Sequence, residues 1–253
     1  MPDNLVPTDS AEAILAQFST AFTVRNLMTP RSDLIGADSL QEALGKHERH
    51  GFDVISYPST GTIKGYFYQG KSFALLTPSD LVSCDTSLLD LLSLLAEREF
   101  FFALHGTQIS GYVHFSDLNK PLMRTPFFIL LEATERHLLS TLRHSVTEDQ
   151  ARNELSVFRI NQIRHYLEAA NQNRSDTTFW DVLGLRDILK IARRHDFARL
   201  SSTETLTEVQ AEDLINLRNK VAHGGHLLVK EHSTVERLID LQKLCTQLRQ
   251  MNS

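Results

Sequence analysis

Hydrophobic and polar positions divide the chain into two parts with different periods. Up to about residue 125, short apolar runs rich in β-forming residues alternate with helical stretches and turn signals. From Thr125 onward, apolar residues recur at spacings of three and four, which is the period of an α-helix. The pattern predicts an α+β chain, with a region of mixed helices and strands followed by an all-helical region.

The first region contains an internal repeat. Three landmarks recur in the same order, 46 to 48 positions apart. The first is a Ser followed three residues later by an acid, the signature of a helix N-terminus, and the other two are short apolar runs that predict strands. The matched segments are Ser39–Leu44 with Ser87–Leu92, Phe52–Tyr57 with Phe100–His105, and Gly65–Tyr68 with Gly111–His114.

Each repeat predicts the order helix, strand, turn, strand, helix. The turns are expected at Pro58–Gly61 and at His105–Thr107. A unit of this size cannot bury its own sheet faces, so we expect the two copies to pack together as a pseudo-symmetric pair.

The opening of the repeat and one later segment resemble the CBS domain family. Val24–Pro30, followed by the first Ser-capped helix, is similar to the start of a CBS domain, and Gly111–Leu118 resembles its Gly-φ-φ-Thr-x-x-Asp-Leu signature. The resemblance implies tandem βαβ CBS repeats that bind an adenine nucleotide (AMP, ADP or ATP) as a regulatory ligand.

The resemblance assigns the nucleotide to Gly111, His114 and Asp117. Asp117 stands where the family holds the ribose hydroxyls, and a carboxylate can accept two hydrogen bonds there. His114 replaces the phosphate-binding Thr, where a protonated imidazole would serve an anion. In the first repeat Tyr68 and Lys71 replace both polar residues, so at most one nucleotide site per chain is expected. The alternatives are a degenerate scaffold module and, for Asp117, a helix cap.

The second region predicts five helices, which favour an up-and-down bundle. They are expected at about 127–139, 148–171, 178–195, 207–222 and 231–250.

The segment Asp213–Gly224 combines an apolar arc with polar chemistry. At 100° per residue, Arg218 projects into the middle of an arc formed by Ala211, Leu214, Ile215, Leu217, Val221 and Ala222. An Arg on a packing face is costly unless it is paired or reaches a cleft. His223 ends the helix before two glycines, where the helix dipole favours a protonated imidazole.

Arg218, Asn219 and His223 resemble the hallmark motif of the HEPN family. The resemblance implies a homodimer in which both motifs line one cleft and cleave RNA without a metal, using the 2′-hydroxyl of the substrate as nucleophile. Arg218 would stabilise the charge on the phosphate, His223 would transfer a proton, and Asn219 would orient one of them. The alternative is a non-catalytic sensing and dimerisation module in which Arg218 and His223 form a structural cluster.

Charge and composition limit the classes of partner that the chain is expected to bind. Residues 1–125 carry nine Lys and Arg against fourteen Asp and Glu, whereas the rest of the chain carries seventeen of each. This balance lacks the broad basic stripe of a constitutive nucleic-acid binder, so any RNA site must be local and DNA is not expected. The longest apolar run, Phe127–Leu131, is too short to span a membrane.

Two cysteines without metal-ligand spacing fit a reducing, cytoplasmic compartment. The clusters His47–His50 and His223–His232 also lack a structural-zinc ligand set, so we expect solvent-facing histidines and no metal.

The predicted organisation has three parts. Residues 1–20 form a helical extension, residues 21–125 form the CBS pair (repeats at about 21–75 and 76–125), and residues 126–253 form the HEPN-like bundle. The function predicted from these parts is an endoribonuclease acting on single-stranded RNA and regulated by an adenine nucleotide.

Overall fold

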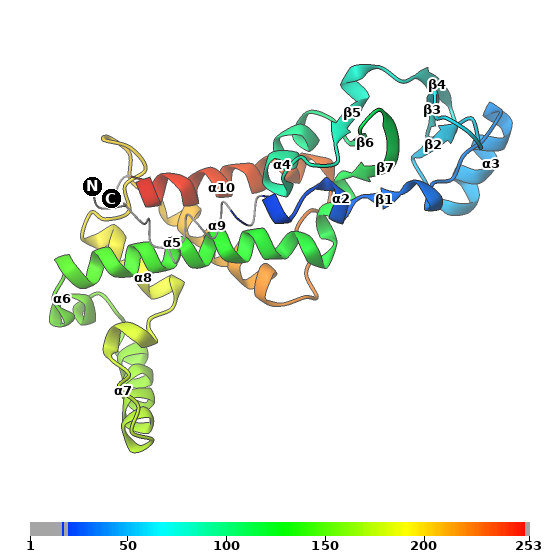
Figure 1. Cartoon of the computed structure of the whole chain (residues 1–253). Helices are drawn as coiled ribbons and strands as arrows, with labels where there is room; N and C mark the ends of the chain where they lie inside the picture. Colours follow the sequence, from blue (N-terminus) through cyan, green and yellow to red (C-terminus); the bar gives the residue numbers. More distant parts are fainter. Residues whose placement is uncertain (1–16, 18–19, 251–253) are drawn as a thin grey trace, which may run out of the picture. The chain divides into compact units, whose positions relative to one another are not determined.

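The chain forms two compact units in a computed structural model that describes residue 17 and residues 20–250. The β-rich unit comprises Ala16–Pro126 and Val229–Glu236, and the helical unit comprises Phe127–Leu228 and the residues from Arg237 on. The predicted α+β class, with a β-rich region followed by a helical one, is confirmed (Figure 1). The helical extension expected over residues 1–20 lies outside the described residues, apart from positions 17 and 20.

The β-rich unit contains a four-stranded and a three-stranded sheet. The first has the order β1-β7-β6-β5, with β5 and β6 parallel and the other pairs antiparallel, and the second is the antiparallel sheet β2-β3-β4. The strands are β1 (Thr29–Pro30), β2 (Val54–Tyr57), β3 (Gly65–Tyr68), β4 (Ser72–Leu75), β5 (Leu81–Ser83), β6 (Phe100–His105) and β7 (Gln108–His114). The helices are α2 (Val24–Leu27), η1 (Arg31–Asp33), α3 (Leu40–His50), η2 (Pro78–Asp80), α4 (Leu88–Glu97), η3 (Phe115–Asn119), η4 (Pro121–Met123) and η6 (His232–Thr234).

The two repeats exchange their leading strands. β1 lies before α3, the Ser-capped helix of the first repeat, but pairs with β7 of the second, whereas β4 lies before α4, the Ser-capped helix of the second repeat, and pairs with β3 of the first. The registers match, because Gly111 lies opposite Pro30 and Gly65 lies opposite Leu75. A Cβ on either glycine would lie 2.6 Å or less from a backbone oxygen of the leading strand, Thr29 in one case and Ala74 in the other. The repeated glycine therefore permits close approach of the exchanged strand.

The predicted helix starts are confirmed. Ser39 Oγ accepts a hydrogen bond from the Glu42 amide (3.2 Å) and begins α3. Ser87 Oγ accepts one from the Asp90 amide (3.1 Å) and begins α4. Each cap satisfies one of the amides that a helix leaves unpaired at its N-terminus.

Aromatic side chains from both sheets form a shared core. Tyr66 of β3 packs edge-on against Phe100 of β6, with ring centroids 5.1 Å apart, and it also contacts Phe102. Ile63, Tyr66, Phe100 and Phe102 make one buried cluster. The two repeats therefore bury their sheets against each other, as expected for a pair that cannot fold singly.

The prediction of a helix at the end of the first repeat is wrong. Gln69 and Gly70 have φ values of 50° and 64°, and the Lys71 amide donates to the Tyr68 carbonyl (3.0 Å). Two successive residues with positive φ form a tight hairpin turn, so the chain reverses into β4 instead of continuing into a helix.

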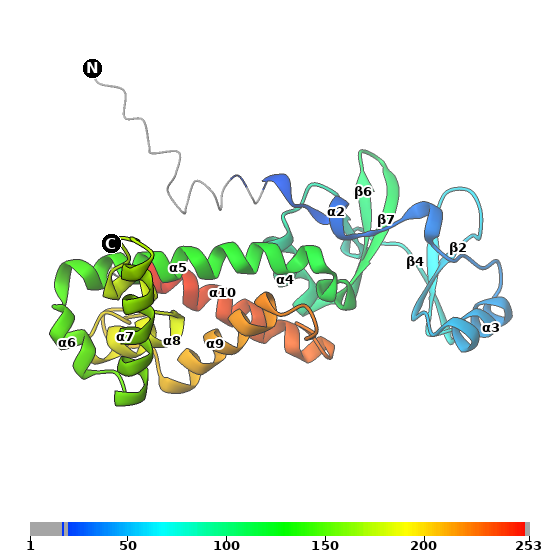
Figure 2. The same ribbon diagram turned by 90° about the horizontal axis from the view of Figure 1, so that it is seen from below.

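The helical unit contains long helices where the apolar period predicts them. They are α5 (Arg124–Ser145), α6 (Glu148–Asn153), α7 (Val157–Gln172), η5 (Phe179–Val182), α8 (Leu185–Arg194), α9 (Glu208–Ala222) and α10 (Val235–Gln250). α5 and α10 run side by side (Figures 1 and 2). Fully buried leucines and isoleucines such as Leu138, Leu142, Ile188 and Leu248 form its core. None of the helices in the described part of the chain is long and apolar enough to cross a membrane.

Two predicted helices are interrupted. The expected 148–171 helix is split into α6 and α7, because Ser156 accepts a hydrogen bond from the Arg159 amide (3.3 Å) and starts a new helix. The expected 178–195 helix becomes η5 and α8, separated at Gly184, which is extended and serves as the N-cap of α8.

Candidate functional site

The residues predicted to bind a nucleotide lie in β7, which contains Gly111 and His114, and in the loop after it, which contains Asp117. Asp117 lies in η3, and its Oδ2 accepts a hydrogen bond from the His114 amide (2.8 Å). Its Oδ1 pairs with Lys120 Nζ (2.9 Å), which also donates to the Leu27 carbonyl (2.6 Å). The side chain of Asp117 is only 13% exposed. The carboxylate thus caps the turn, and each of its oxygens retains an unused lone pair for a hydroxyl donor.

The surroundings of His114 favour the neutral form of its imidazole. The Ser116 amide donates to its Nδ1 (3.2 Å), which places the ring proton on Nε2. Nε2 is buried and has no hydrogen-bond partner among the described residues. Burial lowers the pKa of His114, and the carboxylates of Asp117, Asp53 and Glu99 oppose this shift only in part. The structure therefore disfavours the protonated His114 expected to serve a phosphate.

Gly111 lies in β7, opposite Pro30 and against Met28. In the first repeat Tyr68 donates its hydroxyl to Glu99 Oε2 (2.5 Å), which raises the pKa of Tyr68 to about 12. This pairing fixes Tyr68 at the position that corresponds to His114 in the repeat.

The sequence prediction did not identify a second polar loop, Thr77–Asp80. Asp80 Oδ2 accepts from the Thr77 amide (2.7 Å) and hydroxyl (2.6 Å), and Oδ1 pairs with Arg98. Arg98 also donates to the Ser79 carbonyl (2.7 Å). The signal was present, because Thr77-Pro78 repeats Thr29-Pro30 at the same offset of 48. The carboxylate is almost completely buried, so this loop is held in place by its own contacts.

A segment following α9 packs onto the loop after β7. Asn119 Nδ2 donates to the Val229 carbonyl (2.7 Å), and its Oδ1 accepts from the Val229 amide (3.0 Å). His232 Nε2 lies 2.6 Å from the Leu95 carbonyl, and its ring contacts Phe115 (5.5 Å between centroids). Val229–Glu236 is thus a structural part of the β-rich unit, although the helical unit surrounds it in sequence.

The C-terminal end of α9 holds the second set of predicted residues. Ala211, Leu214, Ile215, Leu217 and Val221 of the predicted arc are buried. Arg218 and Ala222 lie in the same angular sector but are exposed, as are Asn219 and His223. The His223 amide donates to the Asn219 carbonyl (3.0 Å) and His223 ends the helix. The last turn of α9 therefore presents Arg218, Asn219 and His223 on the surface of the chain.

One acidic residue lies in the electrostatic field of Arg218. Burial raises the pKa of Glu135 in α5, the neighbouring Glu132 carboxylate adds to the shift, and the Arg218 guanidinium opposes it. Periodicity alone places Glu135 on a helix without relating it to Arg218, so the sequence prediction missed this pairing.

Among residues 17 and 20–250, no group of three or more His, Cys, Asp or Glu is placed to hold a metal ion. Cys84 and Cys245 are both buried free thiols.

No protein-family model matches the chain, and no curated protein matches it. Three solved structures are similar to part of it, and all are CBS domains of a bacterial CNNM/CorC family Mg²⁺ transporter. The one described in complex with ATP has 18% identity and a TM-score of 0.35, and covers 46% of this chain and 98% of its own. The one in complex with the inhibitor IGN95a has 16% identity and a TM-score of 0.34, and covers 45% and 83%. The third has 17% identity and a TM-score of 0.34, and covers 45% and 82%.

Proposed function

We propose that this chain is a metal-independent endoribonuclease of the HEPN type, acting on single-stranded RNA as a homodimer and regulated by an adenine nucleotide bound to a CBS-type pair of repeats. The observation that carries the catalytic part is the exposure of Arg218, Asn219 and His223 together at the end of α9. Arg218 and Ala222 lie in the core-facing sector of this helix and are nevertheless exposed. A second copy of the chain would complete this face as a cleft.

The chemistry follows from the side chains. His223 takes the proton of the substrate 2′-hydroxyl, and the 2′-oxygen attacks the adjacent phosphorus. The bond from phosphorus to the 5′-oxygen breaks, and that oxygen leaves with a proton supplied by an acid such as the partner's motif. Arg218 stabilises the additional negative charge on the phosphate oxygens through its two parallel donors.

The test of catalysis is cleavage of a fluorescent single-stranded RNA in EDTA. His223→Ala should abolish cutting, and Arg218→Lys should reduce it strongly, because a Lys keeps the charge but loses the two-pronged contact. His226→Ala removes a second exposed histidine from the same loop and is the matched control. Loss of stability or of dimerisation in the Arg218 and His223 variants, with no cleavage by the wild type, would instead identify a non-catalytic sensing module.

The nucleotide part rests on the loop after β7. Asp117 is held in place by its cap and by Lys120, so its remaining lone pairs are preorganised for the ribose hydroxyls. Asp117→Asn retains an oxygen for the His114 amide but loses the charge, and should weaken binding of AMP, ADP or ATP by about tenfold. Asp33→Asn, at an exposed position in the first repeat, is the control. Equal binding by wild type and Asp117→Asn would contradict the assignment.

A further inference from the structure

Helix α8 carries a row of cations along one face. Arg186, Lys190, Arg193 and Arg194 are spaced so that all four fall within an arc of about 100°. The opposite face of α8 holds the buried residues Leu185, Ile188, Leu189, Ile191 and Ala192. The helix therefore separates an apolar face, which anchors it in the bundle, from a basic face.

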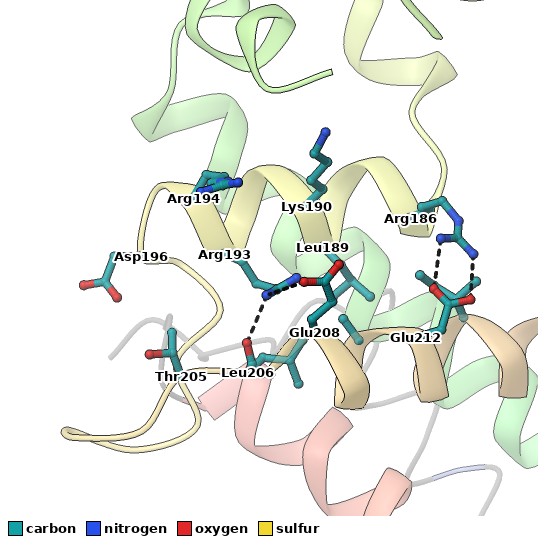
Figure 3. A pocket seen from close by; sticks show the side chains of 12 residues that line it. Arg186, Leu189, Lys190, Arg193, Arg194, Asp196, Thr205, Leu206, Glu208 and Glu212 are labelled. Carbon is teal, nitrogen blue, oxygen red and sulfur yellow. Dashed lines mark hydrogen bonds and ion pairs between the residues drawn. The ribbon is translucent and has the colours of Figure 1, made fainter. Parts of the chain in front are cut away.

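This basic face borders a cavity of about 700 Å³ between α8 and α9. Leu189, Leu206, Ala211 and Ile215 supply its apolar lining, and Asp196, Thr205, Glu208 and Glu212 supply polar groups (Figure 3). The cavity thus combines an apolar surface with charged groups at its border, and its volume is within the range of ligand sites.

The four cations differ in how far they are already engaged. Arg186 forms a two-pronged pair with Glu212, with both distances 2.9 Å. Arg193 donates to the Leu206 carbonyl (3.1 Å) and lies 3.9 Å from Glu208. Lys190 has no hydrogen-bond or ion-pair partner among the described residues, and Arg194 has only a 3.7 Å pair with Glu154.

Figure 3 shows the same difference between the engaged and the less engaged cations. Arg186 and Arg193 point toward α9 and its glutamates, whereas Lys190 and Arg194 extend away from α9. Lys190 and Arg194 are one helical turn apart, about 6 Å along the axis. These two charges are the ones that an external anion would meet first.

We infer that the rim of this cavity, the α8–α9 groove, binds phosphate groups of single-stranded RNA, with Lys190 and Arg194 on the basic face of α8 as the principal contacts. The RNA ligand rests on the proposed function. The groove lies on the N-terminal half of α9, and Glu212 and Arg218 are six residues apart on this helix, or about 9 Å along the axis. A strand held in the groove therefore has its neighbouring nucleotides close to the candidate catalytic motif.

The test measures binding separately from cleavage. The full-length His223→Ala variant is titrated with a fluorescein-labelled 20-nucleotide RNA, and anisotropy is followed at several salt concentrations. Adding Lys190→Ala or Arg194→Ala should weaken binding about three- to tenfold each, and should lower the slope of log affinity against log salt by about 0.7 per lost contact. Lys243→Ala removes the same charge from α10, where Lys243 is 69% exposed, and is the matched control.

A third variant tests the sign of the effect. Glu208→Gln removes a carboxylate that is 89% exposed at the border of the groove, so RNA should bind about two- to threefold more tightly. Unchanged affinity in the Lys190 and Arg194 variants, or an equal loss in Lys243→Ala, would overturn the assignment. AMP that competes with RNA at equal affinity would identify a free-nucleotide site and would also overturn it.

The two proposals fail in different ways. If the wild type does not cleave RNA but the groove variants still lose affinity, the groove assignment stands and the catalytic proposal falls. If cleavage depends on His223 but the groove variants bind normally, the catalytic proposal stands and the groove assignment falls.

Discussion

Asn119 provides the sharpest test of how the β-rich unit is held together. Its side chain pairs with both backbone groups of Val229, at 2.7 and 3.0 Å, and Val229 is only 1% exposed. In Asn119→Ala the amide and the carbonyl of Val229 both lose their partner in a buried site. Each orphaned group costs about 1–3 kcal/mol, so the segment Val229–Glu236 should be destabilised by about 2–6 kcal/mol.

Hydrogen exchange at Thr234 measures this cost locally. The Thr234 amide donates to the Glu231 carbonyl (2.9 Å), a bond that the substitution does not remove. If the segment must detach before this amide exchanges, about 2–6 kcal/mol corresponds to an acceleration of about 30-fold to about 20,000-fold. Asn161→Ala, at an exposed position in α7, is the control. Unchanged exchange at Thr234 would refute the view that Asn119 anchors the segment.

Three further predictions follow from particular contacts. Arg98→Ala should destabilise the chain by about 2–4 kcal/mol in urea unfolding, because it leaves the buried Asp80 carboxylate without its cation. Arg25→Ala breaks an exposed pair with Asp85 and should change the stability far less. Burial lowers the pKa of His114, so the folded chain is stabilised by the neutral imidazole above the unfolded pKa near 6.5, and this stability is lost as the pH falls below that value. The melting temperature should therefore drop from pH 7.5 to pH 5, and it should drop less in His114→Asn. Burial raises the pKa of Cys245 to about 11, so this thiol should resist iodoacetamide at pH 8 until the chain is unfolded, as mass spectrometry would show; rapid native alkylation would contradict the structure.

Local signals predicted most of the elements. The two Ser caps and the apolar runs of β2, β3, β6 and β7 depend on neighbouring residues, so the sequence contains them directly. The strands β1, β4 and β5 have only two to four residues each and form through pairing with another segment. No local pattern marks β1 or β5, because their partners lie further along the chain, whereas β4 follows β3 directly across the Gln69-Gly70 turn.

The candidate sites show the same division between local and tertiary information. Helical periodicity placed Arg218 in the apolar sector of α9, yet the residue is exposed, although Leu217 and Val221 of the same arc are buried. The lowered pKa of His114 depends on its burial in the folded chain, which outweighs the opposing carboxylates of Asp117, Asp53 and Glu99, and these residues are separated in sequence. Neither property can be obtained from the spacing of residue types.

The covalent path between the two candidate sites is short. After His223 only residues 224–228 precede Val229, and the six steps from His223 to Val229 span at most about 22 Å. The Val229 amide donates a hydrogen bond to Asn119, which lies in the same turn as Asp117. After Val229 the chain continues into α10. A nucleotide that prefers one arrangement of this turn would therefore act on the chain on both sides of the segment, and linkage requires only that its affinity differ between the two arrangements. Asn119→Ala should then preserve basal cleavage while removing its response to nucleotide, because the contact that joins the turn to the segment is lost and the side chains of α9 are unchanged.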